Sequence, residues 1–169
     1  SLIDFSGKNL GPASAVVIAA LISDNTSLTV ADLRYNNLDT ESATMLAKIA
    51  KEKKISLCGI TPDQTKADMS GFGKPKMGPE DAILLTADLA VRPSVTSIDV
   101  GFNKIGRAAS LELLAAMKGK NMVTIGMAGC SLGVEGSKVV AEMISVMASV
   151  TSVRALGNSW SSGECRGSC

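Results

Sequence analysis

The chain has 169 residues, a length typical of a single domain that can bury a core of its own. Its 17 Lys and Arg residues nearly balance 16 Asp and Glu residues, so bulk charge does not favour nucleic acid or a membrane surface as a partner. Histidine is absent, which removes the commonest general base, and no apolar run approaches the ~20 residues that span a bilayer.

A pattern of strand, bend and helix recurs along the sequence. Between Ser27 and Ala50, alternating apolar residues predict a short strand, Asn36-Asn37 predicts a bend, and apolar residues at helical spacing predict a helix with Thr40 as its N-cap. One apolar residue closes the bend of each unit. These residues are Leu10, Leu38, Met77, Ile105, Leu132 and Trp160, and consecutive members lie 28, 39, 28, 27 and 28 positions apart. The single long interval requires an insertion.

The insertion lies at 54–64. KISLCGI predicts a strand, TPDQ predicts a turn, and KADMSG predicts the next strand. The space between Ile60 and Lys66 is too short for a helix, so we interpret 54–64 as a stunted repeat that lacks one. The pairs Gly11-Pro12 and Gly78-Pro79 predict helix starts on either side of it. Residues 161–169 have the composition of a linker and are expected to form a flexible tail.

The repeated pattern L-x-x-L-x-L-x-x-N-x-L, followed by a helix, resembles the leucine-rich repeat, specifically its ribonuclease-inhibitor-like subclass. One unit matches it with Leu28, Ala31, Leu33, Asn36 and Leu38, and the pattern covers nearly all of 1–160. The resemblance implies an α/β solenoid, or horseshoe, of about six units of ~28 residues, with a parallel β-sheet on the concave side and helices on the convex side.

The asparagine of the pattern is expected to be structural, because an amide at the bend can satisfy backbone groups that leave the sheet. Lys8 replaces it in the first unit. The expected bend residues are Asn36, Asn103, Cys130 and Asn158.

Alternate residues of each strand are expected to face the concave surface. Counting back from the bends places Asp4, Asp32, Asp68 and Asp99 in one column, which Gly126 and Arg154 continue. One interpretation is an acidic stripe that recognises a basic partner. The other is a solvated face, inherited by duplication, whose repulsion is screened by water and salt and softened by Arg34 and Arg154.

Tyr35 and Phe102 occupy equivalent positions just after their strands, where other units have glycine. In a chain with 3% aromatic residues they are candidate hot spots for a partner, although packing against a neighbouring bend explains them equally well. The candidate partner-binding residues are therefore Asp4, Asp32, Arg34, Tyr35, Asp68, Asp99, Phe102 and Arg154.

No arrangement of residues predicts catalysis or a cofactor. Cys165 and Cys169 lack the histidines or the second close pair of a zinc site, so no metal is expected. The stretch GFGKPKMG lacks the Gly-Lys-Ser/Thr of a phosphate loop, although Lys74 and Lys76 are candidates to meet an acidic partner. The cysteines form no disulfide framework, which favours reduced thiols and an intracellular, cytoplasmic setting.

The leading functional hypothesis is a non-catalytic protein–protein interaction module that binds its partner through the concave sheet and the adjacent rim of bends. An alternative is a permanent subunit of a large assembly, because the first unit starts abruptly inside a strand and needs further chain or a partner to cover it. A third hypothesis comes from the resemblance, since one branch of this repeat family activates small GTPases, but no catalytic arginine can be assigned.

Overall fold

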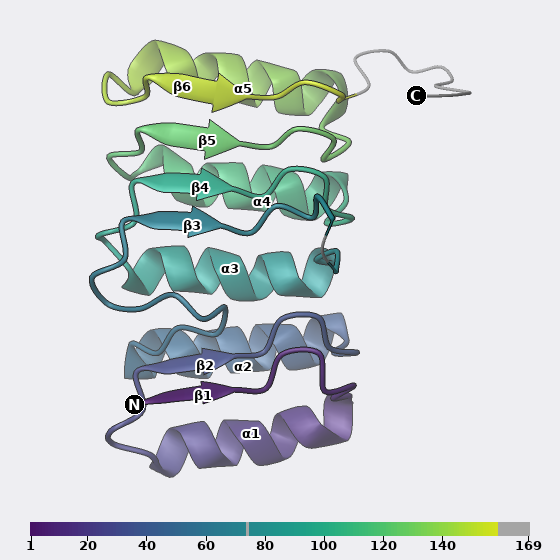
Figure 1. Ribbon diagram of the computed structural model, residues 1–169, viewed down its shortest axis with the longest axis vertical. Helices are drawn as coiled ribbons and strands as arrows, with labels where there is room; N and C mark the ends of the chain where they lie inside the picture. Colours follow the sequence, from purple (N-terminus) through teal and green to yellow (C-terminus); the bar gives the residue numbers. More distant parts are fainter. Residues whose placement is uncertain (74, 159–169) are drawn as a thin grey trace.

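Short strands and helices alternate along the whole of the chain that the computed structural model describes, residues 1–73 and 75–158. The units are stacked along one axis, with the strands forming one layer and the helices a second layer behind them (Figure 1). The predicted repetition of strand and helix is therefore confirmed. The elements are β1 (Leu2–Asp4), α1 (Pro12–Asp24), β2 (Val30–Asp32), α2 (Thr40–Lys53), β3 (Lys66–Asp68), α3 (Pro79–Val91), β4 (Ser97–Asp99), α4 (Arg107–Lys118), β5 (Thr124–Gly126), α5 (Gly133–Val146) and β6 (Ser152–Arg154).

The strands are parallel and belong to a sheet of two strands, β1–β2, and a sheet of four, β3–β4–β5–β6. The division falls where the insertion was predicted. Residues 54–65, all of which the structure describes, contain no helix, and the predicted strand at 54–60 is reduced to isolated bridges from Ser56 to Val30 and from Cys58 to Asp32. Without a helix of its own between them, this segment leaves α2 and α3 packed directly against each other.

The core lies between the two layers and is built from the apolar positions of the repeat. Leu28, Ala31 and Leu33 of the second unit are buried, as their alternation predicts. Ile98 and Val100 are buried in the unit that contains β4, which is the fifth when the stunted repeat at 54–64 is counted as the third. Each strand has only three residues, so a unit cannot bury its apolar stripe without its neighbours. Stability is therefore distributed along the stack.

Asp88 of α3 and Arg92, the C-cap residue of that helix, hold the helix-less segment in place. The Asp88 carboxylate accepts hydrogen bonds from the Leu57 and Cys58 N–H groups at 2.6 and 2.8 Å and from the Ser56 hydroxyl. The Arg92 guanidinium donates to the Ile60 and Lys54 carbonyls at 3.0 and 3.1 Å. These side chains satisfy backbone groups that a neighbouring strand would otherwise satisfy.

The helix starts follow the predictions in two cases and differ in one. Pro12 and Pro79 are the first residues of α1 and α3, as the Gly-Pro pairs predict. The prediction of Thr40 as the N-cap of α2 was wrong, because Asp39 takes that position and its carboxylate accepts from the Ser42 N–H at 2.8 Å. Hydrogen bonding from the Ser42 side chain, and next from this N–H group, lowers the pKa of Asp39.

Several predictions fall outside the described residues: those for Lys74, Trp160, the tail at 161–169, and Cys165 and Cys169. Within the described residues, none of the helices has the length and apolar character needed to cross a membrane.

Candidate partner-binding surface

The asparagines of the repeat lie at the bends and connect each unit to the one before it. Asn103 donates to the Met69 and Val100 carbonyls at 2.7 and 2.9 Å, and its side-chain oxygen accepts from the Met77 N–H at 2.9 Å. Asn36 and Asn158 make the corresponding bonds in their own units. Each amide thus fixes the point at which the chain turns away from the sheet.

Cys130 occupies the same position in the sixth unit but makes weaker contacts. Its Sγ lies 3.3 Å from the Val100 carbonyl, and the side chain is buried. Burial raises the pKa of the Cys130 thiol to about 11, and burial likewise raises that of Cys58. Both thiols are therefore protonated at neutral pH and are poor nucleophiles. Among residues 1–73 and 75–158, no cluster of three His, Cys, Asp or Glu side chains is arranged to hold a metal ion.

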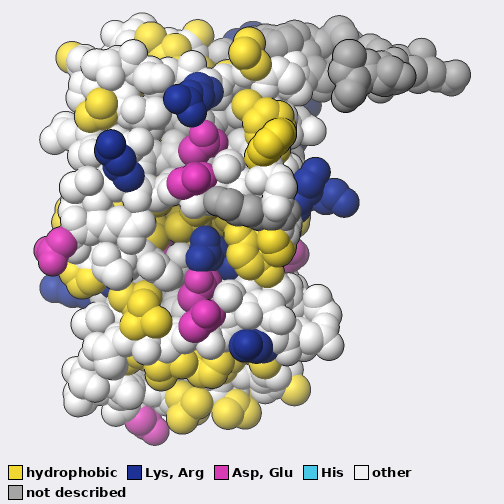
Figure 2. All heavy atoms as spheres, viewed as in Figure 1, with side chains coloured by type: hydrophobic (Ala, Val, Ile, Leu, Met, Phe, Trp, Pro, Cys, Tyr) yellow, Lys and Arg dark blue, Asp and Glu magenta, His cyan; other side chains and the backbone are white. Residues whose placement is uncertain are grey.

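The predicted column of aspartates is present. The strand register pairs Asp4 with Asp32 and Asp68 with Asp99, and the column continues through Gly126 to Arg154. Figure 2 shows acidic side chains along the middle of the strand face, with basic side chains between and beyond them. The charge of this face is therefore mixed rather than uniformly acidic.

Each of these aspartates has a local structural role. Its carboxylate accepts a hydrogen bond from the backbone N–H two residues later, at 2.8 to 3.1 Å, where the chain leaves the strand. Ser6 and Ser70 add hydroxyl bonds to Asp4 and Asp68 at 2.7 and 2.8 Å, and the Ser6 bonds lower the pKa of Asp4. This role explains why aspartate recurs in the column whether or not a partner binds there.

Asp32 is the least accessible member of the column. It is buried, and its two carboxylate oxygens accept from the Arg34 side chain. The backbone of Gly59, at φ +75°, lies against the Asp32 carboxylate, where a Cβ atom would come within 2.9 Å of it. The Asp32–Arg34 pair is therefore largely internal, and Asp68 and Asp99 are better placed to meet a partner.

Tyr35 and Phe102 both have left-handed backbone conformations, with φ of 62° and 60°. The glycines at the equivalent position, Gly7, Gly129 and Gly157, have φ between 62° and 72°. Glycine adopts this conformation without strain, whereas other residues pay about 1 kcal/mol or more. An aromatic residue is thus present where the backbone favours glycine.

The two aromatic residues differ in their surroundings. Tyr35 is half-buried, its N–H donates to Asp81 at 3.0 Å, and the Arg34 guanidinium lies 5.4 Å from its ring centre. Burial raises the pKa of Tyr35. Phe102 is 46% exposed and contacts the ring of Phe72, which is 76% exposed, edge to face at 5.7 Å. Asp81 and Phe72 could not be predicted as site residues from the sequence, because both lie outside the repeated pattern.

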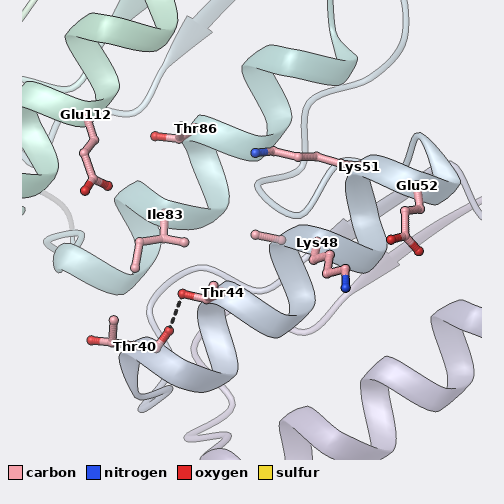
Figure 3. Close-up of a pocket in the computed structure, with 9 residues that line it drawn as sticks. Thr40, Thr44, Lys48, Lys51, Glu52, Ile83, Thr86 and Glu112 are labelled. Atoms are coloured by element: carbon pink, nitrogen blue, oxygen red, sulfur yellow. Dashed lines mark hydrogen bonds between the residues drawn. The ribbon is translucent and has the colours of Figure 1, made fainter.

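Two of the hollows on the described part of the chain bear on where a partner could bind. One, of about 630 Å³, lies on the strand face, and its lining includes Asp68, Ser97, Asp99, Thr124 and Arg154. The other, of about 650 Å³, lies between α2 and α3 and is lined mainly by charged side chains and threonines (Figure 3). Only the first brings predicted partner-binding residues together, namely Asp68, Asp99 and Arg154.

In comparisons with known proteins, the chain matches no protein-family model and no curated protein.

Proposed function

We propose that the chain is a leucine-rich-repeat solenoid that acts as a non-catalytic protein-interaction module, and that its partner binds the strand face together with the rim of bends. The repeated β-α units, the parallel strands and the hydrogen-bonded asparagines support the repeat assignment. Proteins that resemble this subclass mostly act by binding other proteins.

The observation that carries the proposal is the conformation and exposure of Phe102. Its backbone is strained at φ 60°, and 46% of the residue is exposed to water. Neither property contributes to folding, because glycine would relieve the strain and a polar residue would suit the exposure. A large aromatic residue kept at such a position is typical of a contact that a partner buries.

Photo-cross-linking from the whole chain tests this proposal. A photoreactive phenylalanine analogue would replace Thr96, on the strand face, and Thr86, in the groove between α2 and α3, in separate preparations. We expect Thr96 to cross-link a discrete protein in a native lysate and the product to disappear with Phe102→Gly. Cross-links from Thr86 alone, or products from Thr96 that are insensitive to Phe102→Gly, would contradict the proposal.

One feature favours the second function, a permanent subunit of a larger assembly. At the β1 and α1 end of the stack, several large apolar side chains are exposed. They are Leu2, Ile3, Val16, Val17 and Leu21. Several large apolar side chains exposed at one end of a stack are typical of a surface that another polypeptide covers.

Sedimentation of the isolated chain tests this second function. Concentration-dependent self-association that is abolished by Val17→Lys with Leu21→Lys would support a subunit with a covered end. A monomer that stays soluble at high concentration would favour a transient binder.

A further inference from the structure

The outer face of α1 is apolar along almost its whole length. Its exposed residues are Pro12, Ala13, Val16, Val17, Ala20, Leu21 and, near the C-terminal end, Asp24. Helix α1 is the last element at its end of the stack (Figure 1), and Figure 2 shows apolar side chains there. The inner face, which packs on the core, is apolar as well. A helix that is apolar on both faces is typical of one that is covered on both.

The outer faces of other helices in the stack carry charges. Lys48 and Lys51 are exposed on α2, Glu112 on α4, and Glu135 and Glu142 on α5. A partner with a face of that kind would bury charged groups against the apolar face of α1, which is unfavourable. The α1 face of a second copy offers the uncharged surface that is needed.

Two-fold symmetry brings this face against itself. Val17, Ala20 and Leu21 lie near the middle of α1, so they meet their own counterparts when two copies pack with their α1 helices antiparallel. The small side chain of Ala20 leaves room for the larger side chains of the second copy, as in the packing of ridges into grooves. Closed two-fold dimers are the commonest oligomers of soluble proteins, and both copies use the same surface patch.

The charges at the ends of α1 favour the antiparallel orientation. The N-cap residue is Gly11, which has no side chain to accept from the N–H groups of the first turn, and that turn, Pro12-Ala13-Ser14, contains no acidic residue. Asp24, the one charged residue of the helix, lies at the C-terminal end, where the helix dipole disfavours an anion. In an antiparallel pair each Asp24 lies beside the first turn of the other helix, where the dipole favours an anion.

We infer that α1 packs antiparallel against α1 of a second copy and forms a two-fold dimer at this end of the stack. This inference rests on the second proposed function, a subunit of a larger assembly, and names the polypeptide that covers the apolar end. Because both copies use the same surface, the assembly closes at two copies. The strand face and the rim of bends stay free for a partner.

Sedimentation velocity of the whole chain over a wide concentration range measures the assembly. We expect monomer and dimer and no larger species. Leu21→Lys brings a charge of each copy into the interface and should weaken dimerisation by about tenfold or more. Val146→Lys is the matched control, because Val146 is an exposed apolar residue of α5, at the opposite end of the stack, and its replacement should have no effect.

A charge pair tests the orientation of the two helices. Ala13→Lys brings an ammonium group near Asp24 of the second copy and should strengthen dimerisation by about two- to fivefold. The same change should give no gain when it is combined with Asp24→Asn. Both backgrounds are needed because Asp39 and Glu41 line the hollow beside Ala13 and act on the new lysine equally in the two.

Several results would overturn the inference. They are a monomer at every concentration, species larger than a dimer, self-association that Val146→Lys abolishes, and equal effects of Ala13→Lys with and without Asp24→Asn. The third result would mean that copies associate through the α5 end, and the fourth that the helices are not antiparallel.

Cross-linking from Ala20 separates this inference from the function on which it rests. A photoreactive phenylalanine analogue at this exposed position should join two copies of the chain. If the chain is monomeric and Ala20 cross-links a different polypeptide in a native lysate, the subunit function stands and only the dimer fails. If the chain is monomeric and Ala20 gives no product, the subunit function fails as well.

Discussion

Asp99 of β4 and Arg154 of β6 approach each other across β5 because the β5 residue that lies between them, Gly126, has no side chain. The register aligns Asp99 with Gly126 and Gly126 with Arg154. A Cβ atom on Gly126 would lie 2.3 Å from Cγ of Asp99, so the carboxylate occupies the space above this glycine. The bare position lets the charged side chains of β4 and β6 meet at 3.7 Å.

Gly126→Ala is therefore expected to displace the Asp99 carboxylate. The atoms that clash are the end of a partly exposed side chain, which can rotate away, so the free energy of unfolding should fall by about 1 kcal/mol or less. Gly71→Ala is the matched comparison, because its Cβ would lie 2.5 Å from the backbone oxygen of Phe102. The backbone around Phe102 must shift in this variant, which should lower the free energy of unfolding by about 1–3 kcal/mol. Urea denaturation measures both, and equal losses would contradict this account.

The bend position gives a pair of predictions with opposite signs. Asn103→Ala removes three hydrogen bonds from buried backbone groups and should lower the free energy of unfolding by about 1–3 kcal/mol. Cys130→Asn introduces the amide that this position has in other units. Its side-chain oxygen would accept from the Ile105 N–H, just as the Asn103 oxygen accepts from the Met77 N–H. This substitution should raise the free energy of unfolding by about 1 kcal/mol. Urea denaturation of both variants is the measurement, and a loss of stability in Cys130→Asn would show that the sixth unit has a different bend.

The sequence was sufficient for features that depend on the repeat period. The alternation of strand and helix, the burial of Leu33 and Ile98 and the register of Asp68 with Asp99 follow from counting, because each unit repeats the backbone of the last. Features that break the period could not be predicted. The burial of Asp32 depends on the conformation of Gly59. Asp88 binds the backbone N–H of Leu57 because the segment 54–65 lacks a regular strand that would pair with it.

Asp88 should give folding a characteristic pH dependence. Burial raises the pKa of its carboxyl from 3.8 to about 6, because desolvation outweighs the hydrogen bonds that stabilise the anion. The folded protein thus keeps this proton to a higher pH than the unfolded chain does. The contribution of Asp88 to the free energy of unfolding is greatest below about pH 4, falls as pH rises to about 6, and is constant above that.

Comparison with Asp88→Asn isolates this effect. Other carboxyls, including those of Asp4 and Asp39 with their lowered pKa values, titrate alike in both proteins and cancel. The stability advantage of the natural protein over the variant should therefore shrink between about pH 4 and pH 6. Urea denaturation at half-unit intervals provides the data. A difference that is constant or grows over this range would mean that the folded-state pKa of Asp88 is not raised.

Two substitutions of Phe102 distinguish its effect on stability from its effect on binding. Phe102→Gly and Phe102→Ala both remove the ring that contacts Phe72, so both should abolish the cross-link from Thr96. Their stabilities should differ, because alanine retains the strain of φ 60° and glycine does not. We expect Phe102→Gly to exceed Phe102→Ala by about 1 kcal/mol in the free energy of unfolding. The same pair of changes at Tyr35, with φ 62°, is an internal check on the backbone effect. If the alanine variants are as stable as the glycine variants, or more stable, at both positions, the left-handed conformation is not retained in solution. The strain of Phe102 then no longer supports a role in binding.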